Sequence, residues 1–212
     1  MQQLFHHSIS VFMAFFAIMN PIANTPIFIG LTQGDEPAVK RRIASRSLTL
    51  AFLIVLVSSL AGNIIFKVFG ITLPAFRITG GILVFIIGFQ MLHGNPSEVH
   101  NPSHADNRKS LDAELSIIVS PLAVPILAGP GTIATALSFS AHAGLLLTVA
   151  TICVFALLCL ITYAFFIEGQ KFTDYIGESA IKVITRLMGL ILAIVGTQMF
   201  MQGAAGAVKM FR

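Results

Sequence analysis

The sequence is poor in charge and contains no tryptophan. Only 10% of its 212 residues are charged, whereas a soluble domain carries about 25%. Apolar residues make up 56% of the chain and the mean hydropathy is +0.88. These values exclude a soluble globular domain, a disordered chain and a nucleic-acid-binding domain. The two cysteines, Cys153 and Cys159, lie six positions apart in one apolar run and cannot form a disulfide that stabilises the fold.

Uncharged apolar runs long enough to cross a bilayer occur six times. A helix needs about 20 apolar residues to span roughly 30 Å of hydrocarbon. The runs cover residues 8–31, 46–66, 72–93, 115–139, 143–166 and 184–203. The sequence therefore predicts an all-α membrane protein with six transmembrane helices.

A polar stretch divides the six runs into two groups of three. It covers residues 94–114 and is rich in Asn, Pro, Ser and His. We interpret it as a linker between a first three-helix unit, 1–93, and a second, 115–212.

The positive charges are distributed unequally between the two sides of the membrane that six spans define. Nine fall on one side and four on the other, which places the richer side in the cytoplasm and both termini in the periplasm of a bacterial inner membrane. The richer side holds Lys40, Arg41, Arg42, Arg46, Arg108, Lys109, Lys171, Lys182 and Arg186; the other holds Lys67, Arg77, Lys209 and Arg212.

The two units resemble each other at two places. Asn20-Pro21-Ile-Ala in the first run matches Ser120-Pro121-Leu-Ala in the fourth. The third and sixth runs share an Arg, Gly, Gly, Gln order, with Arg77 and Gln90 matching Arg186 and Gln198. Because each unit has three spans, the second enters the membrane from the opposite side. The chain is thus predicted to contain two inverted three-helix repeats, an arrangement typical of alternating-access transporters.

Prolines near the middle of the first and fourth runs predict discontinuous helices there. A proline inside a helix removes a donor and clashes with the preceding turn, and any freed carbonyl needs another partner in lipid. The first run contains Pro21 and Pro26, and the fourth contains Pro121, Pro125 and Pro130. Half-helix N-termini suit a carboxylate, while C-terminal carbonyls suit an ammonium group or a cation.

A small zwitterion fits such a site better than a bare cation. No Asp or Glu lies within any predicted span, so a dehydrated cation would lack a counter-charge. The candidate substrate-binding residues carry neutral polar groups, break a helix or leave the backbone accessible. They are Asn20, Pro21, Asn24, Thr25, Pro26, Ser120, Pro121, Gly129, Gly131 and Thr132. Ser120 opposite Asn20 makes the two half-sites chemically unequal.

Four segments resemble the MarC family of bacterial inner-membrane proteins, which includes the SnatA-type transporters of small neutral amino acids. They read NPIANTPIFIGLT, FGITLPAFRITGGILVFIIGFQML, SPLAVPILAGPGTIAT and ITRLMGLILAIVGTQMF. The resemblance implies six spans, periplasmic termini, an inverted repeat around two unwound helices, and transport of glycine, alanine or similar substrates.

Several residues have structural and functional interpretations side by side. Arg77 and Arg186 are either anchors at helix ends or paired gates, and Gln90 and Gln198 are interhelical hydrogen-bonding groups. The sequence contains no metal-ligand cluster of useful spacing, no cofactor motif and no catalytic signature such as HExxH, GxSxG or a Walker loop. We therefore expect a non-enzymatic protein without a metal or cofactor.

The prediction is a secondary transporter of small neutral amino acids. Alternatives are a carrier of another small solute or ion on the same scaffold, or a membrane-embedded interaction or regulatory protein. A coupling ion would be a proton or sodium, with Glu114, Glu168, a histidine or the substrate itself carrying the proton. The sequence leaves the oligomeric state and the direction of transport open.

Overall fold

Helices are the regular secondary structure among the residues that the structure describes. A computed structural model describes residues 2–32, 34–93, 127–141, 143–169, 171, 175 and 177–210. In chain order the helices are α1 (Gln2–Met19), α2 (Pro21–Leu31), α3 (Pro37–Phe69), α4 (Leu73–Leu92), α6 (Pro130–Ser140), α7 (Gly144–Ile167) and α9 (Glu178–Met210). The predicted linker 94–114 lies outside the described residues.

Five segments are long and apolar enough to cross a membrane. They are Gln2–Leu31, Pro37–Gly62, Leu73–Leu92, Gly144–Ile167 and Ser179–Met210. They correspond to five of the six predicted spans. Of the remaining predicted span, 115–139, the structure describes only residues 127 onward, where the short helix α6 begins at Pro130.

The predicted boundary of the second span is wrong at its N-terminal end. The sequence places Lys40, Arg41 and Arg42 in a loop before residue 46, whereas α3 begins at Pro37 and includes them. Proline is favourable in the first turn of a helix, and Lys and Arg are good helix formers, so the helix continues past the apolar run. The charges reside on a helical extension with Arg41 and Arg42 exposed.

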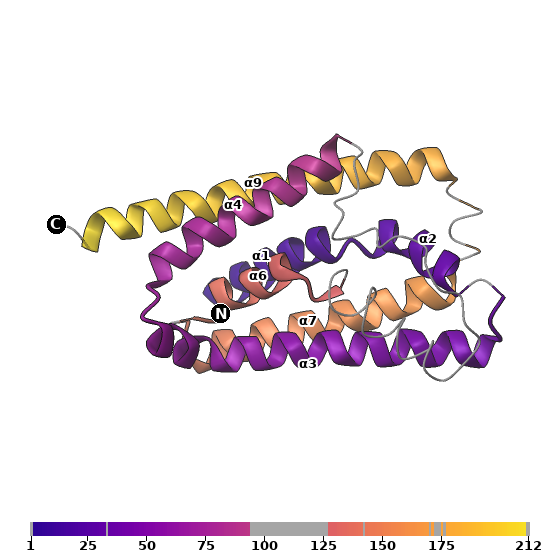
Figure 1. Cartoon of the computed structure of the whole chain (residues 1–212), viewed down its shortest axis with the longest axis horizontal. Helices are drawn as coiled ribbons and strands as arrows, with labels where there is room; N and C mark the ends of the chain where they lie inside the picture. The colour runs from indigo at the N-terminus through magenta and orange to yellow at the C-terminus, as the bar shows by residue number, and fades with distance from the viewer. Residues whose placement is uncertain are drawn as a thin grey trace.

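Helices α4 and α9 form an antiparallel pair along one edge of the molecule (Figure 1). Their backbones meet at glycines. A Cβ added to Gly81 would lie 2.7 Å from the Gly196 carbonyl oxygen, and one added to Gly189 would lie 2.7 Å from that of Gly88. Side chains larger than hydrogen are therefore excluded at these crossings, as in other closely packed membrane helices.

The opposite edge of the molecule is formed by α3 and α7, with α1, α2 and α6 between the two edges (Figure 1). The main apolar core joins these layers through aromatic contacts. Phe15 of α1 packs on Phe155 of α7 with ring centroids 4.8 Å apart, and Phe28 of α2 stacks on Phe166 at 4.4 Å. These contacts fix α1 and α2 along the length of α7.

The two short helices extend toward opposite ends of the bundle. Phe28 in α2 contacts Phe166, near the end of α7, whereas Leu137 and Ala141 at the end of α6 cluster with Phe66, near the end of α3. Figure 1 shows that α2 and α6 both begin near the middle and run apart. Both helices therefore begin near the middle of the bundle's length, α2 at the buried Pro21 and α6 at the exposed Pro130.

Candidate functional site

The first spanning segment changes direction at Asn20. Helix α1 ends at Met19, α2 begins at Pro21, and Asn20 between them adopts a left-handed conformation with φ 38°. Asparagine tolerates this conformation better than most residues, and Pro21 has no N–H to continue the helical pattern. Pro26 lies within α2 without ending it. The residue pair Asn20-Pro21 thus creates the junction.

Three side-chain hydrogen bonds lie around the junction, and the one from Asn24 joins α2 to the last carbonyl of α1. Asn24 Nδ2 donates to the Met19 carbonyl at 2.6 Å, and Thr25 Oγ1 donates to the Pro21 carbonyl at 2.7 Å. Asn20 Oδ1 accepts a bond from the Ala23 N–H at 3.4 Å. All three side chains are buried.

The amide nitrogen of Asn20 is the exception. The residue is 2% exposed, and its Nδ2 has no hydrogen-bond partner among the described residues. A buried donor without a partner costs about 1–3 kcal/mol. Within the described part of the chain, this nitrogen is therefore an unsatisfied donor at the junction.

The start of α6 lies beside the end of α1. Gly129 caps α6 and Pro130 opens it. A Cβ added to Gly131 would lie 3.9 Å from Ile18 of α1 and 3.1 Å from Ile87 of α4. Thr132 Oγ1 donates to the Leu127 carbonyl at 3.2 Å. Ser120 and Pro121, the predicted partners of Asn20 and Pro21, lie outside the described residues.

The site thus combines two helix N-termini with one helix C-terminus. The first turns of α2 and α6 carry partial positive charge, and the end of α1 carries partial negative charge. The Asn20 amide adds a neutral donor. The side chains of Asn20, Asn24, Thr25 and Thr132 are neutral, so the polarity of this region comes from helix ends, amides and hydroxyl groups.

Sequence reasoning missed the contribution of α7 to this region. Thr162 Oγ1 lies 3.3 Å from the sulfur of Met19, directly beside the junction, while it donates to the Leu158 carbonyl at 2.8 Å. Thr148, Thr151 and Thr162 are all buried. Their spacing places them on one face of a helix, so the periodicity of threonine in this otherwise apolar run could have identified that face.

The two predicted gating arginines occupy different environments. Arg77 is half-buried and its Nη2 donates to the Ser138 carbonyl of α6 at 3.3 Å. Arg186 is exposed and makes no hydrogen bond or ion pair with any residue that the structure describes. Only Arg77 is therefore engaged with one of the short helices.

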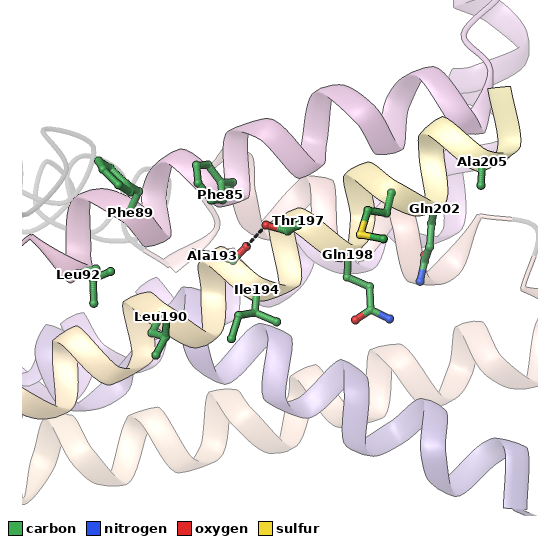
Figure 2. Close-up of a pocket in the computed structure, with 11 residues that line it drawn as sticks. Phe85, Phe89, Leu92, Leu190, Ala193, Ile194, Thr197, Gln198, Gln202 and Ala205 are labelled. Atoms are coloured by element: carbon green, nitrogen blue, oxygen red, sulfur yellow. Dashed lines mark hydrogen bonds between the residues drawn. The ribbon is translucent and has the colours of Figure 1, made fainter. Parts of the chain in front are cut away.

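The predicted glutamine pair does not form interhelical hydrogen bonds within the described part of the chain. Gln90 is half-buried, and Gln198 is exposed in a groove between the outer faces of α4 and α9. Figure 2 shows Gln198 and Gln202 one turn apart, with Phe85 and Phe89 across the groove. The physical reason is that glycines occupy the contact face of α9, which turns Gln198 outward.

Glu168, one of the predicted proton carriers, lies just beyond the end of α7 and outside its membrane-spanning segment. Its carboxylate accepts a 2.8 Å hydrogen bond from Lys171 Nζ. This bond and the charge of Lys171 hold the pKa of Glu168 below its usual value, and they raise the pKa of Lys171. The pair is exposed, and the neighbouring residue Gly169 packs against Thr25 and Ile29 of α2. Glu114 lies outside the described residues.

Replacing Asn24 should destabilise the protein because Asn24 satisfies the last carbonyl of α1. Asn24→Ala leaves the buried Met19 carbonyl without its 2.6 Å donor, at a cost of about 1–3 kcal/mol. We expect a lower midpoint of thermal unfolding in detergent, followed by circular dichroism. Thr185→Ala is the matched control, since Thr185 bonds only within α9. Equal midpoints for both variants would contradict this role of Asn24.

Together, the helical fold and its five long apolar segments are those of a helical membrane protein. The comparison with protein families agrees. The profile of the MarC family integral membrane proteins matches residues 5–208, and the chain belongs to this family.

Relatives from bacteria and archaea cover nearly the full length. The UPF0056 membrane protein YvbG of Bacillus subtilis is 39% identical over 204 residues, which are 96% of each chain. The UPF0056 membrane protein MJ1677 of Methanocaldococcus jannaschii is 35% identical, covering 94% of this chain and 97% of the relative. The UPF0056 inner membrane protein MarC of Escherichia coli is 31% identical, covering 92% of both chains. No solved structure gives a significant match. The family prediction is thus confirmed.

Proposed function

We propose that the protein is a secondary transporter of small neutral amino acids such as glycine and alanine. The observation that carries the proposal is the buried Asn20 Nδ2, which has no hydrogen-bond partner among the described residues and lies where α2 begins; the first turn of α6 lies beside Ile18 of α1. A substrate carboxylate would accept from Asn20 Nδ2 and from the N-terminal turns of the short helices. Its ammonium group would face the carbonyls that end α1.

Alternating access requires two related halves, and several observations support an inverted repeat. Helices α2 and α6 each have 11 residues and begin with proline, at positions 21 and 130. Helix α2 packs on α7 and α9, and α6 packs on α3 and α4 as well as on α1 and α7. Exchanging α2 with α6, α3 with α7, and α4 with α9 converts the two α2 contacts into the α3 and α4 contacts of α6.

The α4–α9 crossing has the same symmetry. Gly81 contacts Gly196, and Gly88 contacts Gly189. Moving along the sequence by 108 residues takes Gly81 to Gly189 and Gly88 to Gly196, so the two contacts exchange. The same register, within one residue, takes Pro21 to Pro130. It therefore pairs Asn20 with Gly129 instead of Ser120, and the second half-site offers backbone where the first offers an amide.

In this proposal the protein lies in the inner membrane, with six spans, discontinuous first and fourth spans, and both termini in the periplasm. The excess of Lys and Arg at the opposite end supports that orientation. A proton or sodium ion would couple transport to an ion gradient. The side chains at the junction, Asn20, Asn24 and Thr25, are all neutral. Neutral side chains favour a zwitterion without net charge over a metal ion or a nucleic acid as the ligand.

Counterflow in proteoliposomes tests the function directly. Vesicles preloaded with unlabelled glycine should accumulate labelled glycine faster than protein-free vesicles, and alanine in place of glycine should sustain the exchange. A folded protein that exchanges neither amino acid would contradict the proposal and favour a membrane-embedded interaction protein. Exchange of another small solute or ion alone would favour a different carrier on the same scaffold.

A further inference from the structure

The last turn of α6 is held by three neighbouring helices. From α4, Arg77 Nη2 donates to the Ser138 carbonyl at 3.3 Å, and from α7, Thr148 Oγ1 donates to the Ser140 carbonyl at 3.3 Å. From α1, the His7 ring meets Phe139 edge to face, with centroids 5.7 Å apart. These contacts hold the last turn of α6 against α1, α4 and α7.

The guanidinium of Arg77 has a donor that makes no hydrogen bond within the described residues. Its Nε is buried and has no hydrogen-bond partner within the described ranges. The Ser138 carbonyl is neutral and supplies a single acceptor. A carboxylate is a stronger partner, because two parallel bonds can form with a guanidinium and both groups are charged. Arg77 is thus bound to a weaker acceptor than it could take.

A buried polar strip connects Arg77 with the central site. Thr132, Thr135 and Ser138 occur every third residue along α6 and are 1%, 0% and 7% exposed. Thr135 Oγ1 has no hydrogen-bond partner among the residues described. The strip begins in the first turn of α6, beside Ile18, and ends where Arg77 contacts Ser138. Hydroxyl groups along this line can replace water around a polar solute that moves between the two positions.

We propose that Arg77 is a carboxylate-binding gate. The carboxylate of a solute replaces the Ser138 carbonyl on the Arg77 guanidinium, which releases the last turn of α6 and opens the strip to water at that end. The identity of the solute as an amino acid rests on the proposed function. Arg186, its counterpart in the repeat, makes no such contact with a described residue, so it provides a matched control.

Thiol accessibility at Ser138 tests the gate without measuring transport. Ser138→Cys leaves the carbonyl that Arg77 binds and is made in a chain carrying Cys153→Ala and Cys159→Ala. A charged methanethiosulfonate reagent should modify this thiol slowly, because the position is buried. Arg77→Ala should raise the rate about tenfold or more, since a hydrogen bond from a charged donor is lost. Arg186→Ala should leave the rate unchanged.

Sodium acetate and methylammonium chloride distinguish a carboxylate site from a purely structural clamp. Acetate and glycine should accelerate modification in the chain with Arg77, and methylammonium should not. Arg77→Gln retains a neutral donor for the Ser138 carbonyl, so it should keep the slow rate and lose the response to acetate. It also serves as the test variant if Arg77→Ala does not fold.

Two results would contradict the proposed gate. One is an unchanged rate of thiol modification in Arg77→Ala, and the other is equal acceleration by acetate in the protein that keeps Arg77 and in Arg77→Gln. These failures are separable from failure of the proposed function. An acetate response that requires Arg77, without glycine exchange in vesicles, contradicts amino acid transport alone. Glycine exchange with an Arg77-independent thiol rate contradicts the gate alone.

Discussion

Replacing Asn20 should raise the glycine concentration needed for half-maximal exchange by about ten- to a hundredfold. The expected loss is that of one hydrogen bond to a charged group, about 1.5–3 kcal/mol, and each 1.4 kcal/mol corresponds to about a factor of ten. Asn20→Gly is the preferred variant, because glycine accepts the observed φ of 38° without strain and removes only the amide. Initial rates of glycine counterflow over a range of concentrations measure the effect.

Two further substitutions separate the amide from the backbone. Asn20→Asp keeps the shape and the tolerance of a left-handed conformation but replaces the Nδ2 donor with an acceptor, so it should impair exchange at least as strongly. Asn20→Ala adds backbone strain of about 1–2 kcal/mol and should also lower the unfolding midpoint. Thr185→Ala, remote from the junction, is the control. Normal exchange by the folded Gly and Asp variants would place the ligand elsewhere.

Whole helices were easier to predict from this sequence than their ends. The third and fifth runs, predicted at 72–93 and 143–166, correspond closely to Leu73–Leu92 and Gly144–Ile167. Helices α3 and α9 extend further than predicted because Lys and Arg support helix beyond the apolar stretch. Hydropathy predicts only the part of a helix that lies in the hydrocarbon of the membrane, whereas the full length of the helix also depends on the polar residues at each end.

The site was predictable only where a local rule applies. Pro21 marks a helix start because proline lacks an N–H, but the sequence gives no reason why Pro26 lies within α2 without ending it. The bond between Arg77 and Ser138 joins residues 61 positions apart and depends on how α6 packs. The outward position of Gln198 follows from the glycine contacts of α9, which become visible only once α4 is placed.

Those glycine contacts make a second strong prediction, that alanine at Gly81 or Gly189 will destabilise the protein. A Cβ at Gly81 would lie 2.6 Å from the Phe200 nitrogen, and one at Gly189 would lie 2.7 Å from the Leu92 nitrogen. Backbone atoms cannot move aside as a flexible side chain can, so α4 and α9 must separate. Overpacking of this kind costs about 1–3 kcal/mol or more, equivalent to a fall of roughly 2–12 °C in unfolding midpoint.

Gly30→Ala supplies the matched control, because nothing lies within 4 Å of a Cβ at that position in α2. Its midpoint should equal or slightly exceed that of the parent, since alanine favours helix over glycine. Circular dichroism during heating in one detergent measures all three variants. Because Gly81 and Gly189 are equivalent in the proposed repeat, similar losses at both positions would indicate that the antiparallel crossing holds the two halves together. Midpoints unchanged at both positions would show that α4 and α9 do not pack closely, which would also remove the strongest support for the inverted repeat.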